Sequence, residues 1–147
     1  MCYMTIFSTT SGADLTDCGS SVVIFSKDIP DVAENIFLKH PNKWFLTTPE
    51  GTCSCGFRNV ERWNVDLLVF CEPEEWSPED QDDIQATHEV VKIIVSILKD
   101  GDAIDSVTAW IQDEEMSHDL VGDIEVNLSE IGVERFRFYD GYRFEYK

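Results

Sequence analysis

One strongly helical segment, residues 78–99, lies between two groups of extended segments, and this order constrains the fold more than any other feature of the sequence. Ser77 is suited to the N-cap, Pro78 to the first helical position, and the acids that follow complement the free amides of a helix start. Lys99 and Gly101 supply the matching stop signal. The residues expected on the inner face recur at helical spacing: Ile84, Thr87, Val91, Ile94 and Leu98. Their wide stripe predicts that this helix packs against a sheet.

The extended segments have the β-branched and aromatic composition of strands. Two segments before the helix flank a Pro-Glu-Gly turn, and two after it flank an Asp-Gly pair, so we expect two hairpins. A further apolar run over residues 66–71 fits either a strand or a buried piece of helix. The expected strands, the hairpin segments included, are residues 2–8, 21–26, 43–48, 52–58, 105–111, 123–128, 134–139 and 142–146.

These elements together predict an α+β fold. We expect a mostly antiparallel sheet packed against the long helix 78–99, with a short helix over residues 31–39 that has Ile36 and Phe37 inward and ends before Pro41. A chain of 147 residues fits one domain, residues 1–147. It is also long enough to bury a core without a metal ion or a disulfide.

The sequence predicts a cytoplasmic protein. No run approaches the ~18 apolar residues of a transmembrane helix. The first residues lack the charged head and the apolar stretch of a secretory signal. The five cysteines are odd in number and irregularly spaced, which is typical of reduced thiols rather than of a disulfide framework.

Nearly all of the excess negative charge lies between Glu72 and Glu134. This block holds 19 Asp and Glu residues and only two bases, Lys92 and Lys99, in a chain of net charge −18. A field of one sign attracts cationic partners and repels nucleic acid and anionic membranes. The segments 105–111 and 123–128 alternate polar and apolar residues, so each is expected to form a strand with one wet, acidic face.

The acidic block has two interpretations. It can serve solubility alone, or it can dock a basic protein or a protein whose nucleic-acid-binding groove the carboxylates occupy. In the second case the chain would act as an inhibitor, an immunity-like protein or a nucleic-acid mimic, and Trp76 would be an aromatic anchor among acids. The residues expected to bind the partner are Glu74, Glu75, Trp76, Asp80, Asp82 and Asp83.

The pair Cys53-x-Cys55 suggests a different kind of site. In an extended segment both thiols face the same side, with Cα atoms ~6.6 Å apart, at the upper limit for a disulfide. A structural zinc ion usually takes four ligands in two close pairs, and Cys71 with the histidines supplies no second pair. Three interpretations remain open: a thiol or zinc-binding module built on Cys53, Cys55 and Cys71, a reactive thiol, or thiols that are simply packed.

Catalytic motifs are absent from the sequence. It has no Gly-x-Ser-x-Gly nucleophile motif and no glycine loop that could cradle phosphate. The acidic clusters lack the spacing of a calcium loop. A Cys–His dyad would need the fold to bring His40, His88 or His118 to a thiol. We therefore expect a protein that is not an enzyme and needs no cofactor.

Three short motifs carry a resemblance. They are His40-Pro41-Asn42-Lys43-Trp44, Gly51-Thr52-Cys53-Ser54-Cys55-Gly56-Phe57-Arg58 and Glu75-Trp76-Ser77-Pro78-Glu79-Asp80. The chain thereby resembles a group of small uncharacterised bacterial proteins with His-Pro-x-x-Trp, Cys-x-Cys-x-Phe-Arg and Trp-x-Pro-Glu-Asp elements. The resemblance implies a bacterial origin and no particular activity. It also implies a role beyond packing for Cys53, Cys55 and Arg58.

Overall fold

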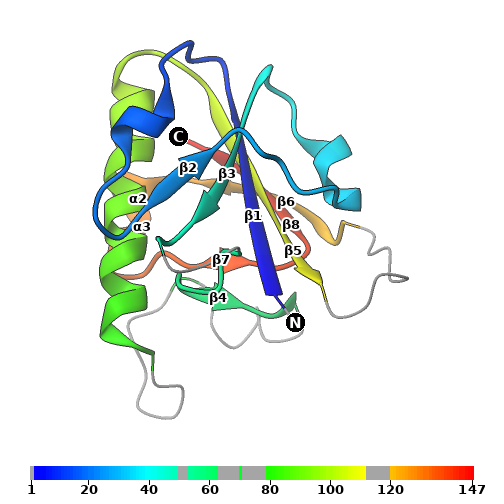
Figure 1. Cartoon of the computed structure of the whole chain (residues 1–147), viewed down its shortest axis with the longest axis vertical. Helices are drawn as coiled ribbons and strands as arrows, with labels where there is room; N and C mark the ends of the chain where they lie inside the picture. The colour runs from blue at the N-terminus through cyan, green and yellow to red at the C-terminus, as the bar shows by residue number, and fades with distance from the viewer. Residues whose placement is uncertain (1, 50–52, 63–69, 71–78, 112–119) are drawn as a thin grey trace.

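A computed structural model describes residues 2–49, 53–62, 70, 79–111 and 120–147. The architecture is α+β, with one long helix against one face of a mostly antiparallel six-stranded sheet and a small two-stranded sheet at one end (Figure 1). This fold class confirms the prediction from the sequence. In the described part of the chain, no helix has the length and apolarity that crossing a bilayer requires.

The six-stranded sheet has the order β2-β3-β1-β5-β8-β6. Neighbouring strands are antiparallel except β6 and β8, which run parallel. The central pair β1–β5 is the longest, from Cys2 opposite Ile111 to Thr9 opposite Ile104. In chain order the strands are β1 (Cys2–Thr9), β2 (Ile24–Ser26), β3 (Asn42–Thr47), β5 (Ile104–Ile111), β6 (Gly122–Val126) and β8 (Tyr142–Tyr146).

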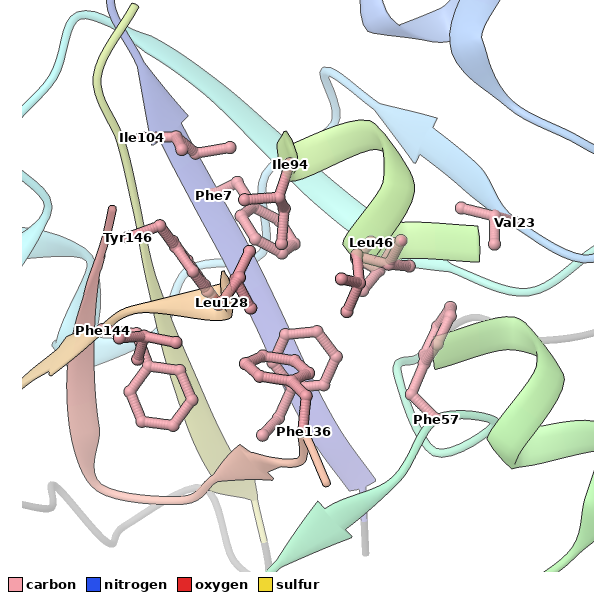
Figure 2. Packing of buried hydrophobic residues seen from close by; sticks show 14 of the residues in the cluster. Phe7, Val23, Leu46, Phe57, Ile94, Ile104, Leu128, Phe136, Phe144 and Tyr146 are labelled. Atoms are coloured by element: carbon pink, nitrogen blue, oxygen red, sulfur yellow. The ribbon is translucent and has the colours of Figure 1, made fainter. Parts of the chain in front are cut away.

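Both faces of the sheet are covered, because successive side chains of a strand point to opposite faces. Phe7 of β1 belongs to the larger core, together with Ile94 of the helix α2 (Gln81–Lys99) and Phe136 (Figure 2). Its neighbour Ile6 belongs to a smaller core on the other face. That smaller core consists of Ile6, Val32, Leu38, Phe45, Val107 and Ala109.

The helix α2 begins later than the sequence indicates. Its N-cap is Asp80, whose side chain accepts a hydrogen bond from the amide of Asp82 at 2.9 Å. Ser77 and Pro78, the predicted start, lie outside the described residues. The predicted stop is confirmed, since the helix ends at Lys99 and Gly101 follows with a φ of 88°. Packing of its apolar face against the sheet is also confirmed.

The predicted short helix 31–39 is a 3-10 helix over Ala33–Phe37. The prediction that Ile36 points inward is wrong, because its side chain is 82% exposed. Phe37 does pack against the smaller core. A 3-10 helix has three residues per turn, so adjacent positions turn further apart than in an α-helix. The described residues also form a 3-10 turn at Leu15–Cys18 and the short helix α3 at Leu128–Ile131.

Both predicted hairpins are wrong. After β3 the chain forms turns over residues 53–57, and the next strand, β4, is only Asn59–Val60. An Asp140-Gly141 turn does follow β7 (Phe138–Tyr139), and Gly141 has a φ of 81°. However, β7 pairs in parallel with β4 in the small sheet, whereas β8 pairs with β5 and β6. The turn thus sends its two strands into different sheets.

The sequence predicts an exposed acidic face on each of two strands, and the structure confirms it for only one of them. Asp123 and Glu125 of β6 are exposed, as expected. The expectation for β5 is wrong, because Asp105 is 0% exposed and forms an ion pair with Arg143 at 2.7 Å. A strand in the middle of a sheet that is covered on both faces has no wet side, so its one acid needs a buried counter-ion.

Candidate functional site

Two adjoining hollows share the start of α2, and one of them also reaches β4 of the small sheet. The first, of about 300 Å³, is lined by Tyr3, Cys55, Phe57, Arg58, Asn59, Val60, Glu79, Asp80, Asp83 and Arg137. The second, of about 400 Å³, is lined by Ser21, Val22, Thr48, Pro49, Gly56, Asp80, Asp82, Asp83 and Ala86. We call the first the arginine hollow and the second the acidic hollow. Asp80 and Asp83 form part of both walls.

The helix start places the three aspartates of the acidic hollow. Asp80 caps the helix, and Asp82 and Asp83 lie in its first turn, where the free amides favour negative charge. Partial burial raises the pKa of Asp83, and the negative charges of Asp80, Asp82 and Glu79 raise it further. Within the described part of the chain, no lysine or arginine forms an ion pair with any of these three aspartates.

Asp83→Asn should therefore stabilise the protein at pH 7, raising Tm by about 1–2 °C. An acid whose pKa is raised in the folded state destabilises that state wherever the group is ionised. The advantage of the asparagine should disappear as the pH falls through the folded pKa of Asp83, because the native carboxyl then carries a proton too. Thermal melts of both proteins between about pH 4 and 8 test this, and a Tm difference independent of pH would contradict it.

In the arginine hollow, Glu79 is the shared counter-ion of two buried arginines. Arg58 and Arg137 are each 1% exposed. The carboxylate of Glu79 accepts hydrogen bonds from Arg58 Nε at 2.7 Å and Nη2 at 2.8 Å, and from Arg137 Nη2 at 2.7 Å. Burial alone would raise the pKa of Glu79, but the hydrogen bonds and charges of the two arginines outweigh it and hold this pKa below its ordinary value.

This cluster joins three parts of the chain that are distant in sequence. Arg58 also donates to the carbonyl of Glu134 at 2.7 Å, and its amide donates to the hydroxyl of Thr87 in α2 at 2.9 Å. The sequence suggests Glu79 only as a first-turn acid of the helix. The two arginines have no sequence signal beyond the Cys-x-Cys-x-Phe-Arg element that contains Arg58, since Arg137 lies in an unremarkable aromatic run.

Half of the predicted partner-binding residues can be located. Asp80, Asp82 and Asp83 lie together in the acidic hollow, whereas Glu74, Glu75 and Trp76 lie outside the described residues. Glu79 lies beside this group, in the arginine hollow, whereas Asp123 and Glu125 are separate from it. Ile124 and Val126 of β6 pack in the same core as α2, so the alternating Asp123 and Glu125 point to the opposite face of the sheet.

A cluster of three cysteine thiols is the third feature of this part of the molecule. Sulfur atoms of Cys2, Cys53 and Cys55 all lie within 4.8 Å of one another. The sequence analysis names Cys53 and Cys55 for this kind of site but pairs them with Cys71, which lies outside the described residues. Cys2 is missed because no spacing rule connects it to a pair some fifty residues later. Cys55 also lines the arginine hollow.

A second acidic cluster, on the other face of the sheet, is already neutralised. His40, Asp105 and Glu145 have potential ligand atoms within 4.8 Å of one another. Arg143 lies among them and donates to Asp105 and to Glu145. The hydroxyl of Ser8 donates to Asp105 as well. An arginine in this position supplies the positive charge that a metal ion would bring, so the cluster is a structural ion-pair network.

The described acids and thiols of both sequence hypotheses thus lie at one end of the molecule, around the start of α2 and the start of β1. Asp80 and Asp83 share the arginine hollow with Cys55. Beyond this geometry, related proteins give no guide: no protein-family model, curated protein or solved structure matches the chain.

Proposed function

We propose that this chain is a non-catalytic protein that binds a basic partner protein through the acidic hollow. The observation that carries the proposal is the crowding at Asp83. Its carboxyl is partly buried beside Asp80 and Asp82, and both this burial and the neighbouring negative charges raise its pKa. In the described part of the chain, none of the three aspartates forms an ion pair with a lysine or arginine. A cationic side chain in the hollow would relieve this repulsion and would form charge-assisted hydrogen bonds with the carboxylates.

The hollow also suits the shape of a lysine or arginine side chain. Its volume is about 400 Å³, and its lining combines the acids with the apolar side chains of Val22, Pro49 and Ala86. Long basic side chains bury their aliphatic stems on apolar surface while the charged head reaches polar groups. A lining that holds both carboxylates and apolar side chains offers contacts for both parts of such a side chain.

The arrangement favours an inhibitor or immunity-like role over mimicry of a nucleic acid. A mimic needs a long row of carboxylates that follows the phosphate spacing. Here Asp105 is buried and paired, and Asp123 lies on the opposite face of the sheet from α2. Glu74, Glu75 and Trp76 remain predicted partner-binding residues.

We also infer a cytoplasmic location. The four cysteines in the described part of the chain, Cys2, Cys18, Cys53 and Cys55, are free thiols. Free thiols in this number favour a reducing compartment.

The test uses a lysine-rich peptide as a probe of cation binding. The triple variant Asp80→Asn/Asp82→Asn/Asp83→Asn should bind the peptide at least about tenfold more weakly than the native chain, measured by calorimetry at about 50 mM salt. The matched control is Asp28→Asn/Asp31→Asn/Glu130→Gln, which removes three exposed acids elsewhere and changes net charge equally. The control should lose no more than about twofold.

Equal losses in the two triple variants would contradict the proposal, because they would show that net charge alone attracts the peptide. Salt provides a second criterion. Affinity that depends on exposed charges should fall when salt is raised from about 50 to 200 mM. An affinity that does not change with salt would also contradict the proposed site.

A further inference from the structure

The thiols of Cys2, Cys53 and Cys55 come from two segments that the fold holds side by side. Cys2 opens β1, and Cys53 and Cys55 lie in the turns that follow β3. The sulfur atoms of all three lie within 4.8 Å of one another. Three thiols at such distances are not the ordinary outcome of packing, because each is partly or fully accessible rather than buried in the core.

Ser54 fixes the segment between the two cysteines. It is 0% exposed, and its amide donates to the carbonyl of Tyr3 at 2.8 Å. Its hydroxyl accepts from the amide of Thr5 at 2.9 Å and donates to the carbonyl of Leu46. Ser54 therefore hydrogen-bonds to β1 at the end of the ladder that β1 forms with β3. These bonds hold Cys53 and Cys55 beside Cys2.

Two further contacts hold Cys55 and the chain around it. The amide of Tyr3 donates to the sulfur of Cys55 at 3.3 Å. The side-chain amide of Asn59 donates to the carbonyls of Ser54 at 2.9 Å and Phe57 at 3.0 Å, which closes the turn. A backbone amide that donates to sulfur stabilises a thiolate, and such outer contacts orient the ligands of metal sites.

We propose that Cys2, Cys53 and Cys55 form a binding site for a thiophilic metal ion, Zn²⁺ or Cu⁺, with three thiolate ligands. Metal–sulfur bonds of about 2.3 Å place three sulfurs roughly 4 Å apart around one ion, so the observed spacing requires only a small contraction. Soft thiolates select these ions over Mg²⁺ and Ca²⁺. Binding releases the thiol protons to solvent, and the exposed Cys55 gives the ion a path of entry.

This inference does not depend on the acidic hollow. The two sites use different residues, and either can fail while the other stands. It also differs from the sequence-based alternative, in which Cys71 rather than Cys2 completes the set with Cys53 and Cys55. Substitution of Cys2 and of Cys71 therefore separates the two assignments.

The experiment titrates the reduced, metal-free full chain with Zn²⁺ against a chromophoric chelator, and in a second arm with Cu⁺ against a Cu⁺ chelator. We expect one ion per chain in at least one arm. Cys2→Ser, Cys53→Ser and Cys55→Ser should each weaken binding at least ~100-fold, more than the loss of an outer contact usually costs. Cys18→Ser is the matched control, since Cys18 is exposed and outside the cluster. X-ray absorption of the loaded chain should show sulfur ligands at about 2.3 Å.

Three results would overturn the proposal. The first is no stoichiometric binding of either ion by the reduced chain, with circular dichroism showing that it is folded. The second is an affinity that Cys2→Ser leaves unchanged while Cys71→Ser abolishes it, which would favour the alternative set. The third is an equal effect of Cys18→Ser. Should a serine variant fail to fold, alkylation of the native thiols with and without bound ion replaces it: protection of Cys2, Cys53 and Cys55 but not Cys18 supports the site, and equal labelling overturns it.

Discussion

Glu79→Ala should lower the free energy of unfolding by about 3–5 kcal/mol, with a fall in Tm of roughly 6–20 °C. The substitution leaves Arg58 and Arg137, both 1% exposed, without the carboxylate that each contacts at 2.7 Å. A buried charge that loses its partner keeps the full cost of its removal from water. Chemical denaturation monitored by tryptophan fluorescence measures the loss.

The matched control is Glu89→Ala, which removes a glutamate of the same helix. Glu89 pairs with Lys92 at 3.5 Å, and the lysine side chain is 71% exposed, so the expected change is below about 1 kcal/mol. Similar losses in the two variants would show that the Glu79 cluster is no stronger than a surface pair, and the structural role assigned to it would be wrong.

Lowering the pH should weaken the cluster of Glu79, Arg58 and Arg137. The folded pKa of Glu79 is lower than its ordinary value of 4.5, so the stabilisation is complete above about pH 4.5 and is lost as the pH falls through the folded pKa. The difference in unfolding free energy between the native chain and Glu79→Gln should be constant between about pH 6 and 8. It should shrink below about pH 4.5. A difference that grows on acidification would contradict the assigned direction.

Asp105→Ala should lower the free energy of unfolding by a similar amount, about 3–5 kcal/mol. The carboxylate is 0% exposed and accepts hydrogen bonds from Arg143 Nε at 2.9 Å and from the amide of Lys39 at 2.9 Å, as well as from the hydroxyl of Ser8. Alanine leaves a largely buried guanidinium, an amide and a hydroxyl without this acceptor. Equilibrium unfolding in urea gives the value.

Asp123→Ala is the matched control, because it removes an acid near the same arginine. Asp123 lies 3.9 Å from Arg143 Nη1 and its side chain is 53% exposed, so we expect a change within about 0.5 kcal/mol. The double variant Asp105→Val/Arg143→Leu should recover part of the loss, since apolar residues can replace a buried ion pair at little cost. A double variant less stable than the sum of its single changes would contradict this account.

The sequence predicts the elements that depend on local pattern. The helix α2 follows from its apolar period and stop signal, and β1 and β5 follow from β-branched and aromatic runs. The errors come from tertiary contacts. Asp140-Gly141 has the local chemistry of a hairpin turn and does turn the chain, but β7 pairs with β4. Next to this pairing, Arg58 bonds to the carbonyl of Glu134 and Arg137 bonds to Glu79, both of them contacts between distant parts of the chain. No local pattern encodes that choice.

The sequence likewise predicts only those parts of the two candidate sites that depend on residues close together in the chain. Asp80, Asp82 and Asp83 are close in sequence and share the first turn of α2, so spacing alone places them together. Cys2 meets Cys53 and Cys55 only because the buried Ser54 docks on β1, a contact between segments about fifty residues apart. The sequence alone predicts that Asp105 begins an exposed face of its strand. The order of the sheet shows that this strand is interior, and Asp105 is buried.

The order of the six-stranded sheet also decides how one of its edges is closed. β8 follows β6 along the chain but lies between β5 and β6 in space. Within the described sheet, β6 is therefore held by β8, through a parallel ladder from Gly122 opposite Tyr142 to Val126 opposite Tyr146. If β6 detaches, the backbone groups of β8 that it covered are exposed, and such an unpaired strand edge is where a strand of a second chain can pair.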